Sequence, residues 1–128
     1  SFIWPLSGRI TSGYGNRYIF GSYSYHSGLD FAGSYGAPIV AADGGKVIFA
    51  GTGTGSSWSL GNYVVIDHEN GLRTTYGHCS SLCVSAGDRV YKGQTIARVG
   101  STGRSTGNHC HFQVRSNGTI VNPWNYLP

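Results

Sequence analysis

The segment Asn62 to His78, NYVVIDHENGLRTTYGH, carries the clearest structural signal in the chain. Its β-branched and aromatic residues flank Asn70-Gly71, a dipeptide that tolerates the positive φ angles of a two-residue type I′ turn. The segment therefore predicts an antiparallel β-hairpin. The expected register pairs three sets of residues across the turn: Glu69 with Leu72, His68 with Arg73 and Tyr63 with His78.

The rest of the sequence has the same character. Short runs rich in Val, Ile, Thr and Tyr are separated by Gly, Asn and Ser, and no run shows convincing helical periodicity. The 128 residues include 21 Gly and nine Tyr but only 11% charged residues, a mixture typical of strands and turns. At this length the chain is expected to form one mainly β domain over residues 1–128.

Two segments look alike: residues 34–51, SYGAPIVAADGGKVIFAG, and residues 85–103, SAGDRVYKGQTIARVGSTG. Each runs from a Gly-containing turn through a short strand and a second Gly turn into another strand. The similarity suggests an internal duplication of one β unit, although alone it is too weak to define a repeat.

Charge and hydropathy argue against several kinds of partner. Nine Lys and Arg against five Asp and Glu give a net charge of +4, but the basic residues are scattered, without the stripe typical of nucleic-acid binding. A weakly basic surface suits an anionic polymer such as a bacterial cell wall. No apolar stretch approaches 18 residues and no initiator Met or signal peptide is present, so we expect a mature or excised domain without a membrane span.

The three cysteines allow at most one disulfide within the chain. Cys79 and Cys83 are four positions apart and could form a short-loop bridge in an oxidising compartment. The alternative is three free thiols, those of Cys79, Cys83 and Cys110.

The stretch NHCHF, residues 108–112, places three common metal-ligand residues in succession. Side chains alternate along a strand, so Cys110 is expected to point into the core, with Phe112 and Val114. The opposite face would carry His109, His111, Gln113 and Arg115. Two strand histidines without function would look the same, so a metal site needs a second part.

The stretch HSGLD supplies that second part. His26 and Asp30 are four positions apart and share a face, and Gly28 between them permits close approach of the backbone. Two imidazoles and one carboxylate, with water as the fourth ligand, form an open zinc site suited to hydrolysis. One histidine of the pair 109 and 111 would complete the set. A solvated His26 and a turn-capping Asp30 remain the alternative at this point.

The remaining histidines are separated by the predicted hairpin. At ~3.3 Å per residue, His68 near the turn and His78 at the far end of its strand lie roughly 17 Å apart, so one zinc ion cannot bind both. We expect His68 to be exposed or locally hydrogen-bonded. His78 is expected to end its strand, where loops begin, and could be a site residue or a structural one.

Three segments then resemble a known family. HSGLD (26–30), YGHCS (76–80) and STGRSTGNHCHFQVR (101–115) are similar, in order and spacing, to the signature segments of the lysostaphin-type zinc endopeptidases, metallopeptidase family 23. The resemblance continues from WPLSGRITSGYGNR near the start to VNPWNYLP at the end, so it covers essentially the whole chain.

The resemblance implies roles for five residues and a fold. It makes His26, Asp30 and His111 the ligands of one zinc ion, and His78 and His109 the catalytic histidines. It also implies an antiparallel sheet with a loop-walled groove, related to the hybrid-motif domains of biotinyl and lipoyl carriers. The sequence departs from the family where Cys79 and Cys110 replace Leu, where Cys83 replaces a polar residue, and where Gln113 stands at a position that is often Glu.

The implied activity is hydrolysis of peptide cross-bridges in bacterial peptidoglycan by a zinc-bound water. The alternative is a non-catalytic peptidoglycan-binding or regulatory module of the same fold. We expect a monomeric domain that meets stem peptides and cross-bridges outside the cell, in the wall or facing the periplasm, as part of a bacterial or phage protein. The scissile bond, glycyl-glycine or a D-amino-acid link, stays open with a lean to the latter. Candidate substrate contacts are Tyr14, Tyr18, Tyr23, Tyr25 and Trp58.

Overall fold

The computed structural model describes the backbone of residues 1–19 and 22–128, and the side chains of residues 1–16 and 25–128. Its regular structure is antiparallel β, as expected, with two short 3₁₀ helices, η1 (Gly55–Leu60) and η2 (Pro123–Asn125). The strands are β1 (Ile10–Ser12), β2 (Gly15–Ile19), β3 (Ser22–His26), β4 (Leu29–Ala32), β5 (Pro38–Val40), β6 (Gly45–Thr52), β7 (Asn62–Asp67), β8 (Leu72–Leu82), β9 (Arg89–Val90), β10 (Thr95–Val99), β11 (His109–Ser116) and β12 (Thr119–Val121).

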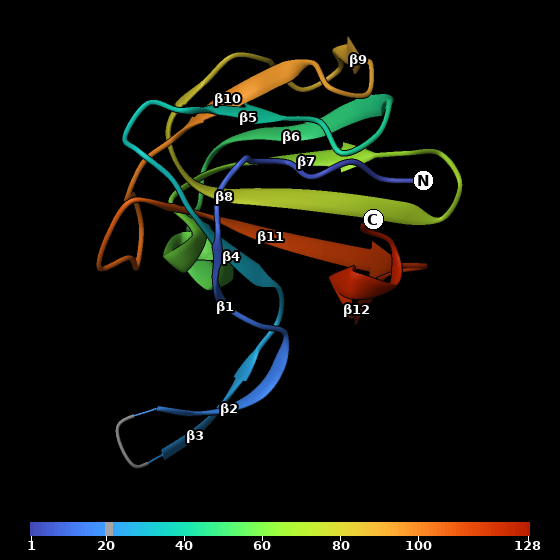
Figure 1. The fold of residues 1–128 in the computed structure, drawn as a ribbon. Coiled ribbons are helices and arrows are strands. Elements are labelled where there is room, and N and C mark those ends of the chain that lie inside the picture. The colour runs from blue at the N-terminus through green and yellow to red at the C-terminus, as the bar shows by residue number, and fades with distance from the viewer. Residues whose placement is uncertain (20–21) are drawn as a thin grey trace.

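One large sheet contains all strands except β2 and β3. Its main path runs β1-β4-β11-β8-β7-β6-β9, while β10 pairs with β5 and β8, and β12 pairs with β11. Strands β2 and β3 pair only with each other and form a ribbon that projects from the sheet (Figure 1). The long strands β8 and β11 are neighbours in the middle of the path and form the platform on which the site is built.

The core lies on one face of this platform. Strand β11 contributes Cys110, Phe112 and Val114, all fully buried, as the alternation of side chains predicts. Tyr76 of β8 and Phe31 of β4 pack against Phe112, with ring centroids 5.4 and 6.3 Å apart. The opposite face of the same strands is therefore left for polar side chains.

The two similar segments pair with each other. The first strand of one segment, β5, pairs with the second strand of the other, β10, and β6 likewise pairs with β9. This reciprocal pairing is the arrangement expected of a duplicated β unit.

The predicted hairpin forms, but its register is shifted by one residue. Asp67 faces Arg73, and the His68 N–H donates to the Leu72 carbonyl, so the loop has three residues instead of two. Positive φ occurs at Glu69 (62°) and Gly71 (89°) and not at Asn70, which excludes a type I′ turn. The side chains of Asp67 and Asn70 each accept a backbone N–H two residues further on, and these bonds stabilise the longer loop. The predicted pairing of Tyr63 with His78 falls in a register irregularity, beyond which Asn62 faces Cys79.

The cysteines are free. Cys79 and Cys110 are buried in the core, whereas Cys83 is exposed, so the short-loop bridge is absent from the structure.

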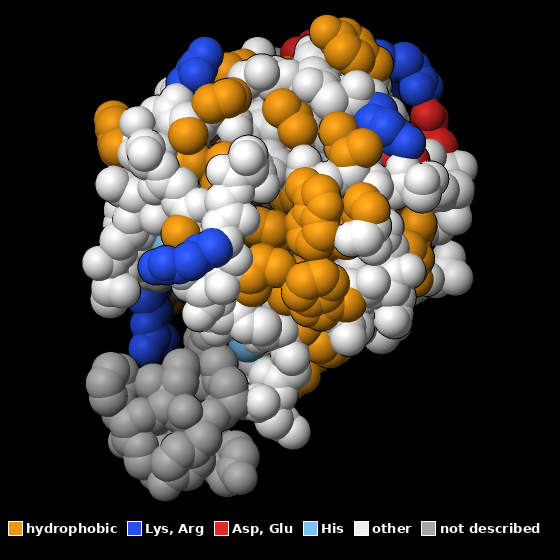
Figure 2. All heavy atoms as spheres, in the orientation of Figure 1, with side chains coloured by type: hydrophobic (Ala, Val, Ile, Leu, Met, Phe, Trp, Pro, Cys, Tyr) orange, Lys and Arg blue, Asp and Glu red, His pale blue; other side chains and the backbone are white. Residues whose placement is uncertain are grey.

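Apolar side chains gather on the face crossed by the two terminal segments (Figures 1 and 2). Within the terminal segments, the rings of Trp4 and Trp124 pack edge to face with centroids 5.6 Å apart, and both are partly exposed. In the described part of the chain, no helix is long and apolar enough to cross a membrane.

Candidate metal and catalytic centre

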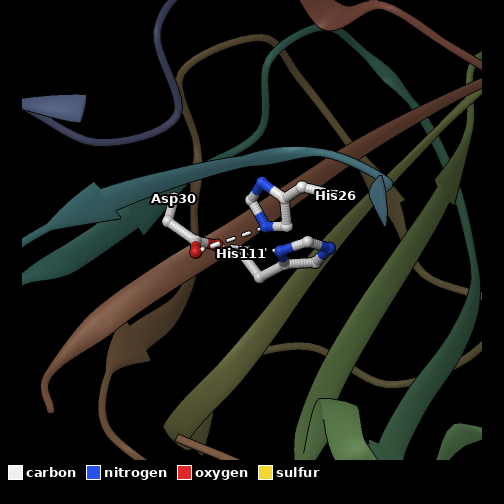
Figure 3. Close-up of side chains that lie close together, drawn as sticks. All are labelled: His26, Asp30 and His111. Atoms are coloured by element: carbon white, nitrogen blue, oxygen red, sulfur yellow. Dashed lines mark hydrogen bonds and ion pairs between the residues drawn. The ribbon is translucent and has the colours of Figure 1, made fainter. Parts of the chain in front are cut away.

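Three predicted ligand residues meet at one point on the polar face. Strand β4 pairs with β11 so that Asp30 lies directly opposite His111, and His26 ends β3 just before β4 begins. The Asp30 carboxylate lies 2.8 Å from His111 Nδ1 and 3.3 Å from His26 Nε2. Figure 3 shows both rings directed at the carboxylate. Spacing in the sequence predicted His26 and Asp30 as partners and left the third ligand open between His109 and His111. The resemblance selected His111, and the strand pairing places this residue opposite Asp30.

Local packing fixes the orientation of His26. Its Nδ1–H donates to the Gly13 carbonyl at 2.8 Å, which leaves the lone pair of Nε2 directed at Asp30. The chain turns here at Gly28, where an added Cβ would lie 2.2 Å from the Phe112 carbonyl oxygen. Glycine is thus required for β4 to approach β11 closely enough to place Asp30 beside His111.

Gln113 and Ser27 orient His111. The amide oxygen of Gln113 lies 2.9 Å from His111 Nε2 and also accepts from the Ser27 hydroxyl at 3.0 Å. An amide oxygen only accepts, so Nε2 carries the hydrogen and Nδ1 presents its lone pair to Asp30. Gln113 is nearly buried, which makes this contact well defined.

The donor set suits a divalent transition metal. One ligand atom from each of His26, Asp30 and His111 lies within 4.8 Å of the others, so these three atoms can bind one cation together. Burial by itself would raise the pKa of the Asp30 carboxyl, but in their protonated forms His111 and His26 donate hydrogen bonds to it and place positive charge beside it, which lowers this pKa well below its usual range. The carboxylate is therefore ionised, as a ligand must be. Two imidazoles and one carboxylate are a ligand set typical of hydrolytic zinc.

His78 lies beside this cluster through an irregularity in β8. The expectation that His78 ends its strand is wrong, because β8 continues to Leu82. His78 instead has φ 63°, and the pairing of β8 with β7 and β10 shifts register around it. Simple alternation would bury His78 with Tyr76; the irregularity turns His78 to the polar face and Cys79 into the core.

The two remaining histidines present free nitrogens to the same space. His78 Nδ1–H donates to the Thr102 carbonyl at 2.7 Å, and His109 Nδ1–H to the Gly107 carbonyl at 2.9 Å. Their rings lie 4.5 Å apart, and His109 Nε2 is 3.7 Å from Asp30. Burial lowers the pKa of His78, and the nearby His109 and His111 lower it further, against the opposing effect of its bond to Thr102. Both Nε2 atoms can therefore accept a proton near the cluster.

A groove passes over the cluster. Its floor comes from β6, β7, β8 and β11, and its walls come from the loop of residues 101–108, from η1 and from Tyr25. A register shift in β6 turns both Ile48 and Phe49 toward the groove, where Phe49 stacks on Tyr63 at 4.3 Å.

The aromatic residues predicted to contact the substrate differ in their position relative to the groove. Tyr25 lines the groove, and its hydroxyl lies 2.7 Å from that of Tyr14, which packs against the core. Trp58 is 58% exposed on η1, while its neighbours Ser57 and Ser59 line the groove. The side chains of Tyr18 and Tyr23 lie outside the described residues.

His68 lies away from the cluster, as predicted, and is locally hydrogen-bonded. A directed relay runs from the Ala42 N–H to the Tyr76 hydroxyl, then to the Thr74 hydroxyl and to His68 Nε2, and His68 Nδ1–H donates to the Gly44 carbonyl. His68 is buried, so of the two expected environments the hydrogen-bonded one is present.

Sequence reasoning missed the residues that support the histidines. Thr102 and Gly107 act through backbone carbonyls, which no side-chain pattern reveals. Phe49 and Tyr63 read as ordinary strand residues, because a register shift has no clear sequence signature. Gln113 was detectable by its place on the polar face of its strand, but its bond to His111 was not.

Comparison with known proteins agrees with this geometry. The model of Peptidase family M23 matches residues 24–123. The DD-carboxypeptidase/endopeptidase Mpg of Neisseria meningitidis is 42% identical over 117 residues, which cover 90% of this chain and 26% of that protein. The murein hydrolase activator NlpD of Escherichia coli is 35% identical over 125 residues, 98% of this chain and 31% of that protein. The chain thus spans about a quarter to a third of these relatives.

Solved structures show the same fold. A zinc-containing peptidase from Vibrio cholerae superposes with a TM-score of 0.84 at 37% identity, covering 94% of this chain and 38% of that one. The catalytic domain of the antimicrobial peptidase lysostaphin from Staphylococcus simulans gives a TM-score of 0.80 at 35% identity, covering 93% of this chain and 91% of that one.

Proposed function

This chain belongs to peptidase family M23, and we propose that it is a zinc-dependent endopeptidase that hydrolyses peptide cross-bridges of bacterial peptidoglycan. The observation that carries the proposal is the convergence of all five residues on one groove: His26, Asp30, His111, His78 and His109. The domain, residues 1–128, would act as the catalytic unit of a larger secreted or envelope protein.

His26, Asp30 and His111 would hold one zinc ion through Nε2, a carboxylate oxygen and Nδ1. A zinc ion held there would supply an activated water molecule and polarise the substrate carbonyl. Gln113 keeps Nδ1 of His111 free of hydrogen, so that its lone pair is available.

His78 and His109 would move the protons of the reaction. Each donates its Nδ1–H to a backbone carbonyl, which fixes the ring and leaves Nε2 as the proton acceptor. Because the lowered pKa of His78 keeps this ring neutral to lower pH, it is suited to accept the proton of the nucleophile. Either ring could then return the proton to the leaving amine. Groups in this role contribute ~100 to 10,000-fold in rate.

A second function, regulation or binding of peptidoglycan without catalysis, is favoured by one observation: the similarity to an activator of murein hydrolases over 98% of this chain. The complete set of five residues in this chain supports catalysis. Zinc content together with cleavage separates the two functions.

The test compares three alanine variants. His111→Ala should abolish zinc binding, because a ligand is lost, and abolish cleavage. His78→Ala and His109→Ala should retain zinc and lose ~100-fold or more in the rate of cross-link cleavage. Zinc is measured by elemental analysis and cleavage by release of amino groups from purified peptidoglycan; His68→Gln, away from the groove, serves as control. If His109→Ala lost zinc and His111→Ala kept it, the ligand assignment would be reversed.

A further inference from the structure

The groove carries a one-sided distribution of charge. The described residues that line it include three arginines, Arg73, Arg104 and Arg115, but only one carboxylate, that of Asp30. The Asp30 carboxylate is already in contact with His26 and His111. Apart from the cluster of His26, Asp30 and His111, the charged side chains of the groove are thus all cationic.

Two of these arginines form an unfavourable pair. Arg73 of β8 and Arg115 of β11 lie directly opposite each other in the register. Like charges at such positions destabilise a sheet, because their side chains lie within ~5.5 Å at Cβ. Both line the groove, on the same strand face as His111 and Gln113. Arg115 lies four residues from His111 along β11, or ~13 Å.

Little within the protein neutralises this pair. Arg73 Nη2 is 3.8 Å from the Asp67 carboxylate, a long and partly exposed contact. Among the described residues, Arg115 donates to the Gly118 carbonyl alone, at 3.1 Å. Throughout the described part of the chain, neither Arg115 nor Arg104 has an ion-pair partner. The pair therefore offers up to two guanidinium groups to an external anion.

Arg104 lies on the other side of the metal cluster. It belongs to the loop of residues 101–108, which also holds His78 through the Thr102 carbonyl and His109 through the Gly107 carbonyl. Its backbone is fixed by a hydrogen bond from Arg104 N to the Ser59 carbonyl. Cations thus flank the reacting centre on both sides.

We propose that this groove selects acidic cross-links, with one peptide carboxylate bound by Arg73 and Arg115 and a second by Arg104, over neutral oligoglycine bridges. The inference rests on the proposed peptidase function and adds its substrate class. Direct cross-links between stem peptides, whose glutamate and diamino-acid residues carry free carboxylates, have this chemistry. An oligoglycine bridge presents no charge near its scissile bond.

The test uses three purified muropeptide dimers: one directly cross-linked with free carboxylates, the same dimer with its carboxylates amidated, and one with a pentaglycine bridge. Cleavage by the zinc-loaded protein gives kcat and KM for each. Equilibrium binding is measured separately by calorimetry in the His109→Ala background, where cleavage is slow. We expect the free-carboxylate dimer to bind about tenfold more tightly than the other two, and more weakly as salt rises.

The charge-removing variant is R73Q/R115Q. It should raise KM for the free-carboxylate dimer about tenfold, leave kcat unchanged, and leave binding of the amidated dimer unaffected. Arg98→Gln is the matched control, because Arg98 is also an exposed strand arginine that donates to a single backbone carbonyl, Gly36, but lies outside the groove. Arg104→Gln should raise KM severalfold in the same assay.

The outcomes distinguish the two proposals. Equal binding of all three dimers, or an unchanged KM in R73Q/R115Q, overturns the inference and leaves the peptidase function standing. Cleavage of none of the dimers overturns the proposed function, and the binding series still decides for or against acidic peptides as ligands.

Discussion

At the residue scale, the site depends on which nitrogen of each histidine is free. His26, His78 and His109 donate Nδ1–H to backbone carbonyls, whereas His111 is held at Nε2 by Gln113. Strand alternation predicted that His109 and His111 share a face. It could not divide their roles, because the division depends on β4 pairing with β11 so that Asp30 lies opposite His111.

The Gln113 contact gives the first prediction. Gln113→Leu removes the acceptor at His111 Nε2 and should weaken zinc binding by ~10 to 100-fold, since partners of this kind set ligand orientation. Gln113→Glu preserves the acceptor and should bind zinc at least as tightly as the wild type. Competition with a chromogenic chelator measures the affinity, and circular dichroism of the metal-free variants controls for folding. A wild-type affinity in Gln113→Leu would show that the contact does not position His111.

At the element scale, irregularities in long strands build the groove. His78 reaches the cluster of His26, Asp30 and His111 because it adopts φ 63° within β8, a conformation uncommon for residues other than glycine. The hairpin could be predicted from β-branched runs around Asn70-Gly71. Its register could not, because side-chain bonds from Asp67 and Asn70 stabilise a three-residue loop.

The strain at His78 is measurable. In the metal-free protein, His78→Gly should be more stable than His78→Ala by about 1 kcal/mol, because glycine adopts positive φ without the Cβ clash. Urea unfolding of the two variants gives the difference. The same pair of substitutions at Arg98 in β10, a residue without positive φ, should show the opposite order. If alanine were the more stable replacement at position 78, the backbone there would not be strained.

The buried relay at His68 predicts a pH dependence of stability. Burial lowers the pKa of His68 in the folded state, against weaker opposing effects of the Gly44 carbonyl and nearby carboxylates. In the unfolded chain this histidine has a pKa of ~6.5 and binds a proton more readily. The free energy of unfolding should therefore fall as the pH drops below ~6.5, and the contribution of His68 should be fully present above that pH. Urea unfolding of metal-free protein between pH 5 and 8 measures this, with ~6.5 as the reference point. His68→Gln should have a shallower slope; an identical slope would exclude His68 as the source.

At the scale of the whole molecule, the mainly β class and the segment duplication were accessible from composition and spacing. The reciprocal pairing of β5 with β10 and of β6 with β9 was not, because it joins segments about fifty residues apart that carry no pairing signal of their own. The cysteine alternatives were also undecided by sequence. Packing decides them by placing Cys79 in the core and Cys83 at the surface.

Thiol reactivity tests that packing. Under native conditions Cys83 alone should react with iodoacetamide, because burial raises the pKa of Cys79 to about 12 and that of Cys110 well above its ordinary value. After denaturation all three should react. Intact mass counts the labels, and Cys83→Ser is the control that should remain unlabelled in the native state. Native labelling at two sites, or a mass showing an oxidised pair, would contradict the packing.

The proposed function rests on zinc bound by the cluster of His26, Asp30 and His111. Its most direct test is mass spectrometry of purified, directly cross-linked peptidoglycan incubated with the domain after zinc has been removed by a chelator, and again after one equivalent is restored. We expect intact cross-links without zinc, and cleaved cross-links with new amino termini once zinc is restored. Zinc-loaded protein that leaves every cross-link intact, or metal-free protein that cleaves them, would contradict it.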